Sequence, residues 1–151
     1  MTLQMCLVGF TRPRRGAGMP EPATLATGTS LAVFVPCVKL LSLNRMLSGL
    51  TPGARWSIIE NARKQRNLVT HALRNKPKPA LPLVVTVTRV APGQGLDPHD
   101  NLPGACKHVV DTIAAWLAID DRDERITWRY AQACDGRTYG VGIRFEPRSE
   151  P

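Results

Sequence analysis

The chain has 151 residues, 20 Lys and Arg against 12 Asp and Glu, and a formal net charge of +8 at pH 7. That length is enough for one domain with an apolar core and too short for two ordinary domains. The longest apolar stretch, residues 30–43, is interrupted by Pro36 and Lys39 and falls short of the roughly 18 uninterrupted apolar residues of a membrane span. We therefore expect a protein with no membrane partner.

The charge is distributed unevenly along the chain. Residues 1–90 hold 13 Lys and Arg and 2 acids, a net charge of +11, whereas residues 91–151 hold 7 Lys and Arg and 10 acids, a net charge of −3. Such a split is typical of a basic surface that binds a polyanion, next to an acidic cluster that needs a compensating cation. A solvated basic face explains the first half equally well.

Residues 1–29 are expected to form a disordered N-terminal extension, because they are rich in Gly, Pro, Thr and Ala and show no periodicity. Their apolar patch precedes the Arg residues, which is the reverse of the order in a secretory signal. The four cysteines stand far apart and show neither paired zinc-ligand spacing nor a disulfide framework. We therefore expect a cytoplasmic protein whose folded domain covers residues 30–147.

The first half of that domain predicts a strand, a helix and a second strand. Residues 30–41 are rich in β-branched and apolar side chains, with Pro36 marking a bulge or an edge position. Residues 42–53 indicate a loop. Residues 54–75 show helical periodicity, and the apolar stripe that we expect to be buried consists of Ile58, Ile59, Ala62, Val69, Ala72 and Leu73. Residues 81–90 then predict a central strand.

The second half predicts a helix and two more strands. Residues 101–117 favour a helix capped by Asp100 or Asn101, with a buried stripe of Leu102, Cys106, Val109, Ile113 and Leu117. Residues 126–132 and 139–145 alternate apolar and polar side chains, and Asp135-Gly136 between them indicates a hairpin turn. The predicted fold is a single α+β domain of order β-α-β-α-β-β, with a mixed sheet of about four strands and two main helices packed on it.

Carboxylates stand at both ends of the second predicted helix. Asp97 and Asp100 flank its start, and Asp120 and Asp121 follow its end. They converge only if the second loop turns back along the sheet. Converging carboxylates would suit Mg²⁺ or Mn²⁺, which orients a water molecule and lowers its pKa for phosphodiester hydrolysis. The alternative is that these residues serve only as helix caps and turn residues.

Lys107 is the one Lys or Arg residue of this helix, seven positions after Asp100 and four before Asp111. All three residues share a face of a regular helix. Lys107 either contacts a phosphate group and stabilises the charge that develops there, or forms an ordinary surface ion pair with Asp111.

These acids and Lys107 carry a resemblance to a known family. The segment from Asp97 to Leu102, followed by Lys107, Asp111 and Asp120-Asp121, resembles the Asp-x-Asp-Asn-Leu…Lys…Asp…Asp-Asp signature of the RusA-type Holliday-junction resolvases. Upstream, Ser42-Leu-Asn44 is similar to the Ser-x-Asn of that family. Trp56, followed by Arg63, Lys64 and Arg66, resembles its aromatic and basic first helix.

The resemblance implies a homodimeric, Mg²⁺-dependent endonuclease that cuts four-way DNA junctions in recombination and repair, usually encoded by a phage or prophage. It implies metal binding by Asp97, Asp100, Asp121 and Asp120, with Lys107 as the catalytic lysine and no small-molecule cofactor. The spacings depart from the family pattern in two places. Asp97 stands three residues before Asp100 instead of two, and Lys107 stands seven after it instead of four. A non-catalytic scaffold that binds DNA junctions is the alternative.

Binding to branched DNA is expected to rest on phosphate contacts from the first helix and the segment after it. The expected contact residues are Arg63, Lys64, Arg66, Arg74, Lys76 and Lys78. Trp56 either stacks on an exposed base or, as is commoner for an aromatic residue near a helix start, belongs to the core. Trp116, Trp128 and Tyr130 are expected in the core or in a dimer interface.

Overall fold

Six elements follow one another along the chain in the computed structural model, which describes residues 30–42, 51–93, 95–134 and 137–148. They are β1 (Leu31–Pro36), α2 (Pro52–Leu73), β2 (Leu83–Ala91), α3 (Asn101–Leu117), β3 (Ile126–Cys134) and β4 (Gly140–Pro147). The expected α+β fold and its element order are therefore confirmed. The extension expected over residues 1–29 lies outside the described residues, as do residues 43–50 of the expected loop.

The four strands form one mixed sheet in the order β1-β4-β2-β3. β2 runs parallel to β3 and antiparallel to β4, and β4 is antiparallel to β1. The parallel pair is joined through α3, as a parallel connection requires a crossover segment. Because α3 leaves the end of β2 and returns to the start of β3, it runs against both strands and has one loop at each end of the sheet.

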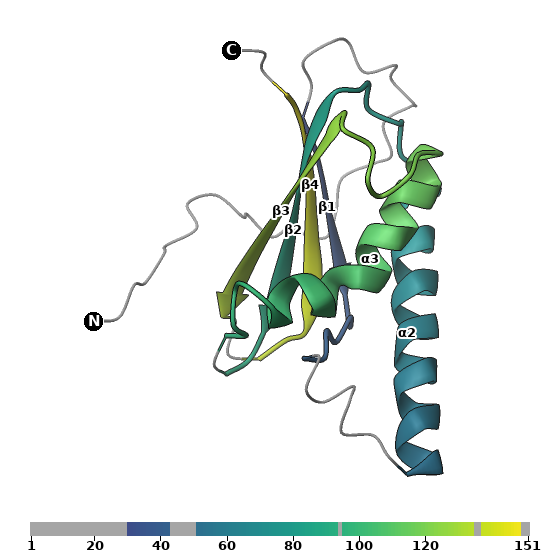
Figure 1. The fold of residues 1–151 in the computed structure, drawn as a ribbon, viewed down its shortest axis with the longest axis vertical. Coiled ribbons are helices and arrows are strands. Elements are labelled where there is room, and N and C mark those ends of the chain that lie inside the picture. Colours follow the sequence, from purple (N-terminus) through teal and green to yellow (C-terminus); the bar gives the residue numbers. More distant parts are fainter. Residues whose placement is uncertain (1–29, 43–50, 94, 135–136, 149–151) are drawn as a thin grey trace, which may run out of the picture.

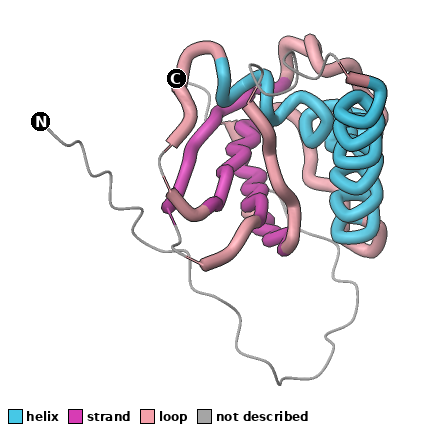
Figure 2. The backbone as a smooth tube through the Cα atoms, turned by 90° about the horizontal axis from the view of Figure 1, so that it is seen from below, coloured by secondary structure: helices cyan, strands magenta, loops and turns pink. Residues whose placement is uncertain are grey.

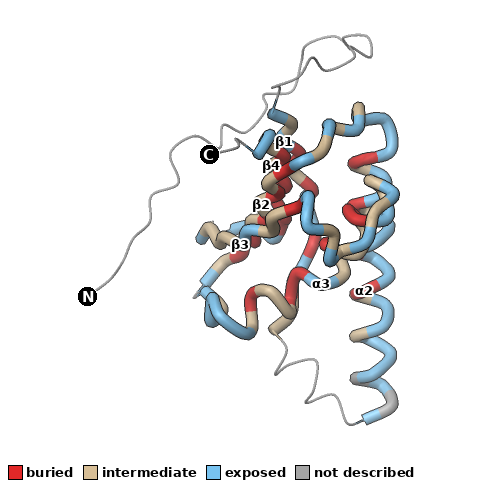
Figure 3. Tube along the Cα trace, turned by 45° about the horizontal axis from the view of Figure 1, so that its top comes forward, coloured by how far each residue is buried: buried red, intermediate tan, exposed pale blue. Residues whose placement is uncertain are grey.

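Both helices lie on the same side of the sheet (Figures 1 and 2). α2 packs against β1 and α3, and α3 packs against β2 and β3. The first turns of α2 extend beyond the sheet and beyond α3, and their surface is exposed (Figures 1 and 3).

The core lies between the sheet and the helices. Phe145 is fully buried on β4 between Leu31 of β1 and Val85 of β2, and its ring lies 5.6 Å from that of Trp116 on α3. Four of the five residues expected to be buried on α3 are buried, and Leu117 packs against the core in a half-buried position. Trp128 and Tyr130 are also partly buried against this core, as expected.

The predicted hairpin between the last two strands is wrong. β2 lies between β3 and β4 in the sheet, so the two strands joined through Asp135-Gly136 are not neighbours. The turn signal reports local backbone preference only, whereas the pairing follows from the apolar β2 taking the central position. Asp135 and Gly136 themselves lie outside the described residues.

Several expected boundaries also shift. β1 ends at Pro36 because Pro36 has no N–H to donate and Cys37 follows with a φ of 63°, and β1 is an edge strand, as Pro36 indicated. α2 begins two residues earlier than expected. Ile59, expected in the core, is 61% exposed because it lies in the N-terminal half of α2, where the neighbouring residues 55–57 and 60 are also exposed. Among the described residues, no helix combines the length and the apolar character needed to cross a membrane.

Replacing Phe145 by Ala should lower the free energy of unfolding by about 3–5 kcal/mol, because a large fully buried ring leaves a cavity that only partly collapses. Urea denaturation followed by far-UV circular dichroism measures the change. Ile59→Ala is the matched control, and its exposed side chain should change the stability by less than about 0.5 kcal/mol. A loss below about 1 kcal/mol for Phe145→Ala would contradict the described core.

Candidate functional site

Asp97 and Asp100 are exposed in the loop that enters α3. The Asp97 carboxylate accepts a hydrogen bond from the backbone N–H of His99 at 3.0 Å, and its carbonyl accepts one from the N–H of Leu102 at 2.9 Å. Asp100 occupies the N-cap position of α3, but its side chain makes no cap hydrogen bond. The capping expected of Asp100 is therefore limited to its backbone, and its carboxylate remains available to a ligand.

Asp120 and Asp121 follow the C-terminal end of α3. The helix ends at Ala118, which has a φ of 62° and whose N–H bonds to the carbonyls of the last turn. The Asp120 carboxylate accepts a hydrogen bond from the backbone N–H of Arg122 at 2.9 Å, and this bond, together with the Asp121 side chain, lowers the pKa of Asp120. Two acids beside the negative end of a helix dipole favour a bound cation.

The loop that carries Asp121 is held against the sheet by Trp128. The indole Nε1 of Trp128 donates a hydrogen bond to the backbone carbonyl of Asp121 at 2.8 Å. Tyr130, two residues further along β3, has a pKa raised by burial and also by the nearby Cys106 and Asp121. The backbone at Asp121 is therefore fixed to β3.

α3 nevertheless keeps the two carboxylate pairs apart. Its 17 residues span about 25 Å at 1.5 Å per residue. In the part of the chain that the structure describes, no group of three or more His, Cys, Asp or Glu side chains is placed to hold one metal ion. Mg²⁺, however, is usually held by one or two carboxylates together with water and substrate phosphates. Either pair has the oxygen donors that such a site needs.

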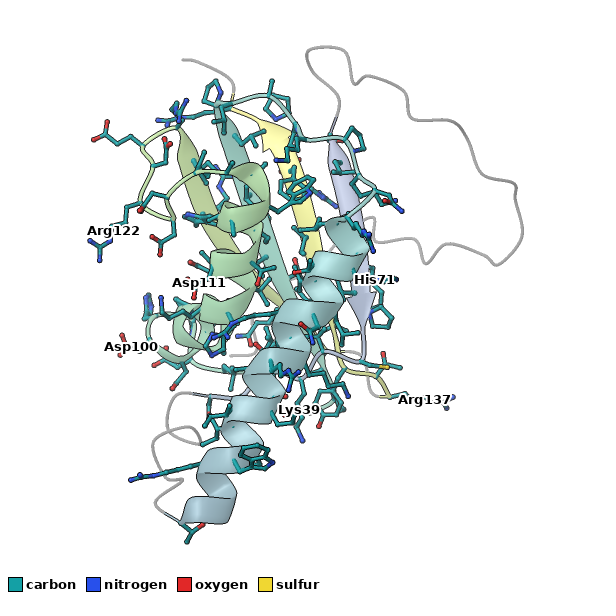
Figure 4. The ribbon with its side chains drawn as sticks, turned by 90° about the vertical axis from the view of Figure 1, so that its right-hand side faces the viewer. Lys39, His71, Asp100, Asp111, Arg122 and Arg137 are labelled. Carbon is teal, nitrogen blue, oxygen red and sulfur yellow. The ribbon has the colours of Figure 1, made fainter. Side chains whose placement is uncertain are left out.

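Lys107 forms the expected surface ion pair with Asp111. The distance from its Nζ to the Asp111 Oδ1 is 3.3 Å, and the two side chains are 64% and 37% exposed. An exposed pair four residues apart on a helix stabilises it by only about 0.2–0.5 kcal/mol. Lys107 can therefore exchange this carboxylate for a phosphate at little cost. Figure 4 shows Asp100, Asp111 and Arg122 along the same side of the molecule as α3.

Asp123 differs from the other acids of the same loop. Its carboxylate accepts hydrogen bonds from the Arg125 side chain at 2.9 and 2.6 Å and from the Arg125 backbone N–H at 3.0 Å. These contacts lower the pKa of Asp123 to about 2. Because its charge is already paired, Asp123 is a natural control for the neighbouring acids.

The basic residues expected to bind DNA are all exposed. They are Arg63, Lys64 and Arg66 on α2, Arg74 directly after its last residue, and Lys76 and Lys78 in the segment that follows. Trp56 is 69% exposed, which excludes the core role considered from the sequence. Trp56, Arg63 and Arg74 are 7 and 11 residues apart, close to whole numbers of helical turns, so they form one stripe about 27 Å long.

Arg66 also connects the two helices. Its Nη2 donates to the Nδ1 of His108 on α3 at 3.3 Å, so the neutral His108 carries its proton on Nε2. The pKa of His108 is lowered by burial and by Arg66, and Lys107 lowers it further while Asp111 opposes the shift. No sequence pattern indicated this contact.

A second contact that no sequence motif indicated positions the loop before α3. The Gln132 side chain on β3 accepts a hydrogen bond from the N–H of Leu96 at 2.8 Å and donates one to the Leu96 carbonyl at 2.6 Å. Gly95 lies so close to Gln132 that a Cβ atom there would be 2.9 Å from the Gln132 Nε2. The backbone just before Asp97 is therefore fixed to the sheet.

Comparisons with known proteins return no family. No protein-family model matches the chain, and no curated protein matches it.

The His108 contact predicts a loss of stability in mild acid. Because the pKa of His108 is lowered from 6.5 in the folded state, the folded protein binds this proton less tightly than the unfolded chain does. The stabilisation is present above pH 6.5 and is lost as the pH falls through the lower pKa of the folded state. Melting temperatures between pH 7.5 and pH 5 should therefore fall more steeply for the wild type than for His108→Gln. Equal slopes would contradict this assignment.

Proposed function

We propose that the protein is a Mg²⁺-dependent endonuclease that hydrolyses phosphodiester bonds at four-way DNA junctions, as the RusA-type resolvases do, and acts as a homodimer in recombination and repair. Mn²⁺ would substitute for Mg²⁺, and the place of action would be the cytoplasm of a bacterial host carrying a phage or prophage. The observation that carries the proposal is the two pairs of carboxylates at the ends of α3, of which Asp97, Asp100 and Asp120 are exposed and Asp121 is half-buried, beside the basic, aromatic face of α2.

The proposed metal ligands are Asp97 and Asp100 together with Asp121 and Asp120. Because α3 separates the two pairs, holding one ion with all four requires the loops at the two ends of α3 to move together when DNA binds. Bound there, the ion would supply an activated water molecule and neutralise charge on the phosphate. The availability of the Asp100 carboxylate supports this assignment, as does the anchoring of the Asp121 loop by Trp128. Lys107, whose ion pair with Asp111 is exposed, would contact the phosphate that is cut and stabilise the charge that develops on it.

DNA binding would use the α2 face, with Arg63, Arg66 and Arg74 contacting phosphates. The remaining contacts would come from Lys64, Lys76 and Lys78. Because each phosphate contact releases counterions, affinity would fall steeply as the salt concentration rises. Trp56 lies on the same stripe as Arg63, in the first turns of α2, and its exposed side chain can reach bases that are unpaired at a branch point.

A second candidate is a scaffold that binds DNA junctions without cutting them. The separation of the two carboxylate pairs by α3 favours it, since no trio of ligands is assembled among the described side chains. Metal-dependent stabilisation separates the two functions. If Mg²⁺ or Mn²⁺ raises the melting temperature of the wild type and not of Asp100→Asn, the metal-free scaffold is excluded.

Asp100→Asn and Asp121→Asn should each reduce junction cleavage by at least about 100-fold. Loss of a residue that only hydrogen-bonds to a metal ligand already lowers metal affinity or activity by about 10–100-fold, and loss of the ligand itself should have a larger effect. Junction binding should be equal or stronger, since a negative charge near phosphate is removed. Cleavage of a labelled junction and its gel shift are measured in parallel.

Asp123→Asn is the matched control for these variants, because its carboxylate is already paired with Arg125. It should retain both cleavage and binding. Loss of binding and folding in Asp121→Asn, or equal loss of cleavage in Asp123→Asn, would count against the metal-site assignment.

Trp56→Ala should weaken binding to a four-way junction or to single-stranded DNA by about tenfold, because stacking on one base is worth about 1–3 kcal/mol. Binding to a linear duplex of equal length should change much less. Ile59→Ala, an exposed apolar neighbour on the same helix, is the control. Equal losses on junction and duplex would show that Trp56 does not stack on unpaired bases.

A further inference from the structure

Arg89 is a buried cation that forms no ion pair with any residue that the structure describes. It lies on β2, is 9% exposed, and has a fully buried Nε that makes no hydrogen bond. Its neighbours across the sheet are Val141 on β4 and Gln132 on β3. Neither of the ion pairs found among the described residues involves Arg89.

The position of Arg89 makes this arrangement unusual. The other inward-facing residues of β2 are Leu83, Val85, Val87 and Ala91, all apolar and at most 2% exposed. An arginine cannot lose its proton at any ordinary pH, so it cannot avoid the cost of burial by becoming neutral. A buried charge is destabilising where its donors stay unsatisfied, as the Arg89 Nε is. An oxyanion ligand would satisfy this donor and balance the charge.

Arg89 lies at the same end of the sheet as the loop that carries Asp97 and Asp100. Gln132, its neighbour on β3, is the residue that holds the backbone of Leu96, one residue before Asp97. Cys106 of α3 lies near Arg89. Burial raises the pKa of the Cys106 thiol to about 12, and the charge of Arg89 acts in the opposite direction. Arg89 therefore lies at the end of β2 that leads into the loop before α3, next to the strand residue that holds this loop, and near enough to Cys106 of α3 for its charge to act on that thiol.

We propose that Arg89, together with the N-terminal end of α3, forms a binding site for a phosphate group. The planar guanidinium offers parallel N–H donors that match phosphate oxygens, and the helix N-terminus adds a partial positive charge on the same side. The source of the phosphate would be the DNA strand held next to Asp97 and Asp100, and this part of the inference rests on the proposed function. Free phosphate has the same chemistry.

Phosphate binding is tested without DNA or cleavage. Melting temperatures of the wild type and of Arg89→Met are measured while sodium phosphate replaces sodium chloride at constant ionic strength. Phosphate should stabilise the wild type and leave Arg89→Met unchanged, and Arg89→Met should be at least as stable as the wild type without phosphate, because an unpaired buried charge has been removed. Arg144→Met, on β4, is the control and should keep the phosphate response.

Arg89→Lys keeps the charge but loses the paired donors, so it should fold and bind phosphate about tenfold more weakly. If Arg89→Met does not fold, Arg89→Lys still tests whether phosphate binding depends on the guanidinium group. A phosphate response of Arg89→Lys equal to that of the wild type would overturn the proposal, as would a wild type that responds no more to phosphate than to chloride.

Junction binding by the same variants distinguishes the sources of the phosphate. Weaker binding by Arg89→Lys than by Arg144→Met assigns the site to a DNA phosphate. Unchanged DNA binding with a weakened phosphate response assigns it to free phosphate. A phosphate response that depends on Arg89 in a protein that never cleaves a junction would support this site and contradict only the proposed nuclease activity.

Discussion

The packing of α3 across β2 and β3 is the constraint on which the candidate site depends. Its buried stripe, including Cys106, Val109 and Ile113, fixes the helix against the two parallel strands, so that one acidic loop lies at each end. The hydrogen bonds of Gln132 with Leu96 and of Trp128 with the Asp121 carbonyl then hold those loops to β3. A single helix thus sets both the position and the separation of the carboxylates.

The charges follow the same arrangement. The exposed basic residues expected to bind DNA lie on α2 and on the segment that follows it, whereas Asp97, Asp100, Asp120 and Asp121 lie at the two ends of α3, and the Arg66–His108 contact joins the two helices. DNA that contacts the stripe from Trp56 to Arg74 would pass beside α3, where a metal ion would offset repulsion between phosphates and carboxylates. The basic and acidic halves seen in the chain are therefore two neighbouring surfaces of one domain.

The sequence predicted the helix of residues 101–117 with its final bounds, because a strong apolar stripe and clear end signals agree there. The burial of Ile59 and the hairpin at Asp135-Gly136 were predicted wrongly for the same reason. Periodicity and turn signals report what a segment prefers locally, and they carry no information on how far the sheet extends or which strand is inserted. The burial of Arg89 was not predicted, because a single basic residue in an apolar strand gives no local signal of the side chain's surroundings. Whether the acids converge depends on how the loops fold back, which no local pattern encodes.

The most direct test of the proposed nuclease uses the unmodified protein. A labelled, immobile four-way junction and a linear duplex of matched sequence are each incubated with Mg²⁺ or with EDTA, and the products are resolved on a denaturing gel. Paired symmetric nicks in the junction alone, present with Mg²⁺ and absent with EDTA, are the predicted result. An intact junction at every metal concentration, despite a stable complex on a native gel, would contradict the account and leave the non-catalytic scaffold in its place.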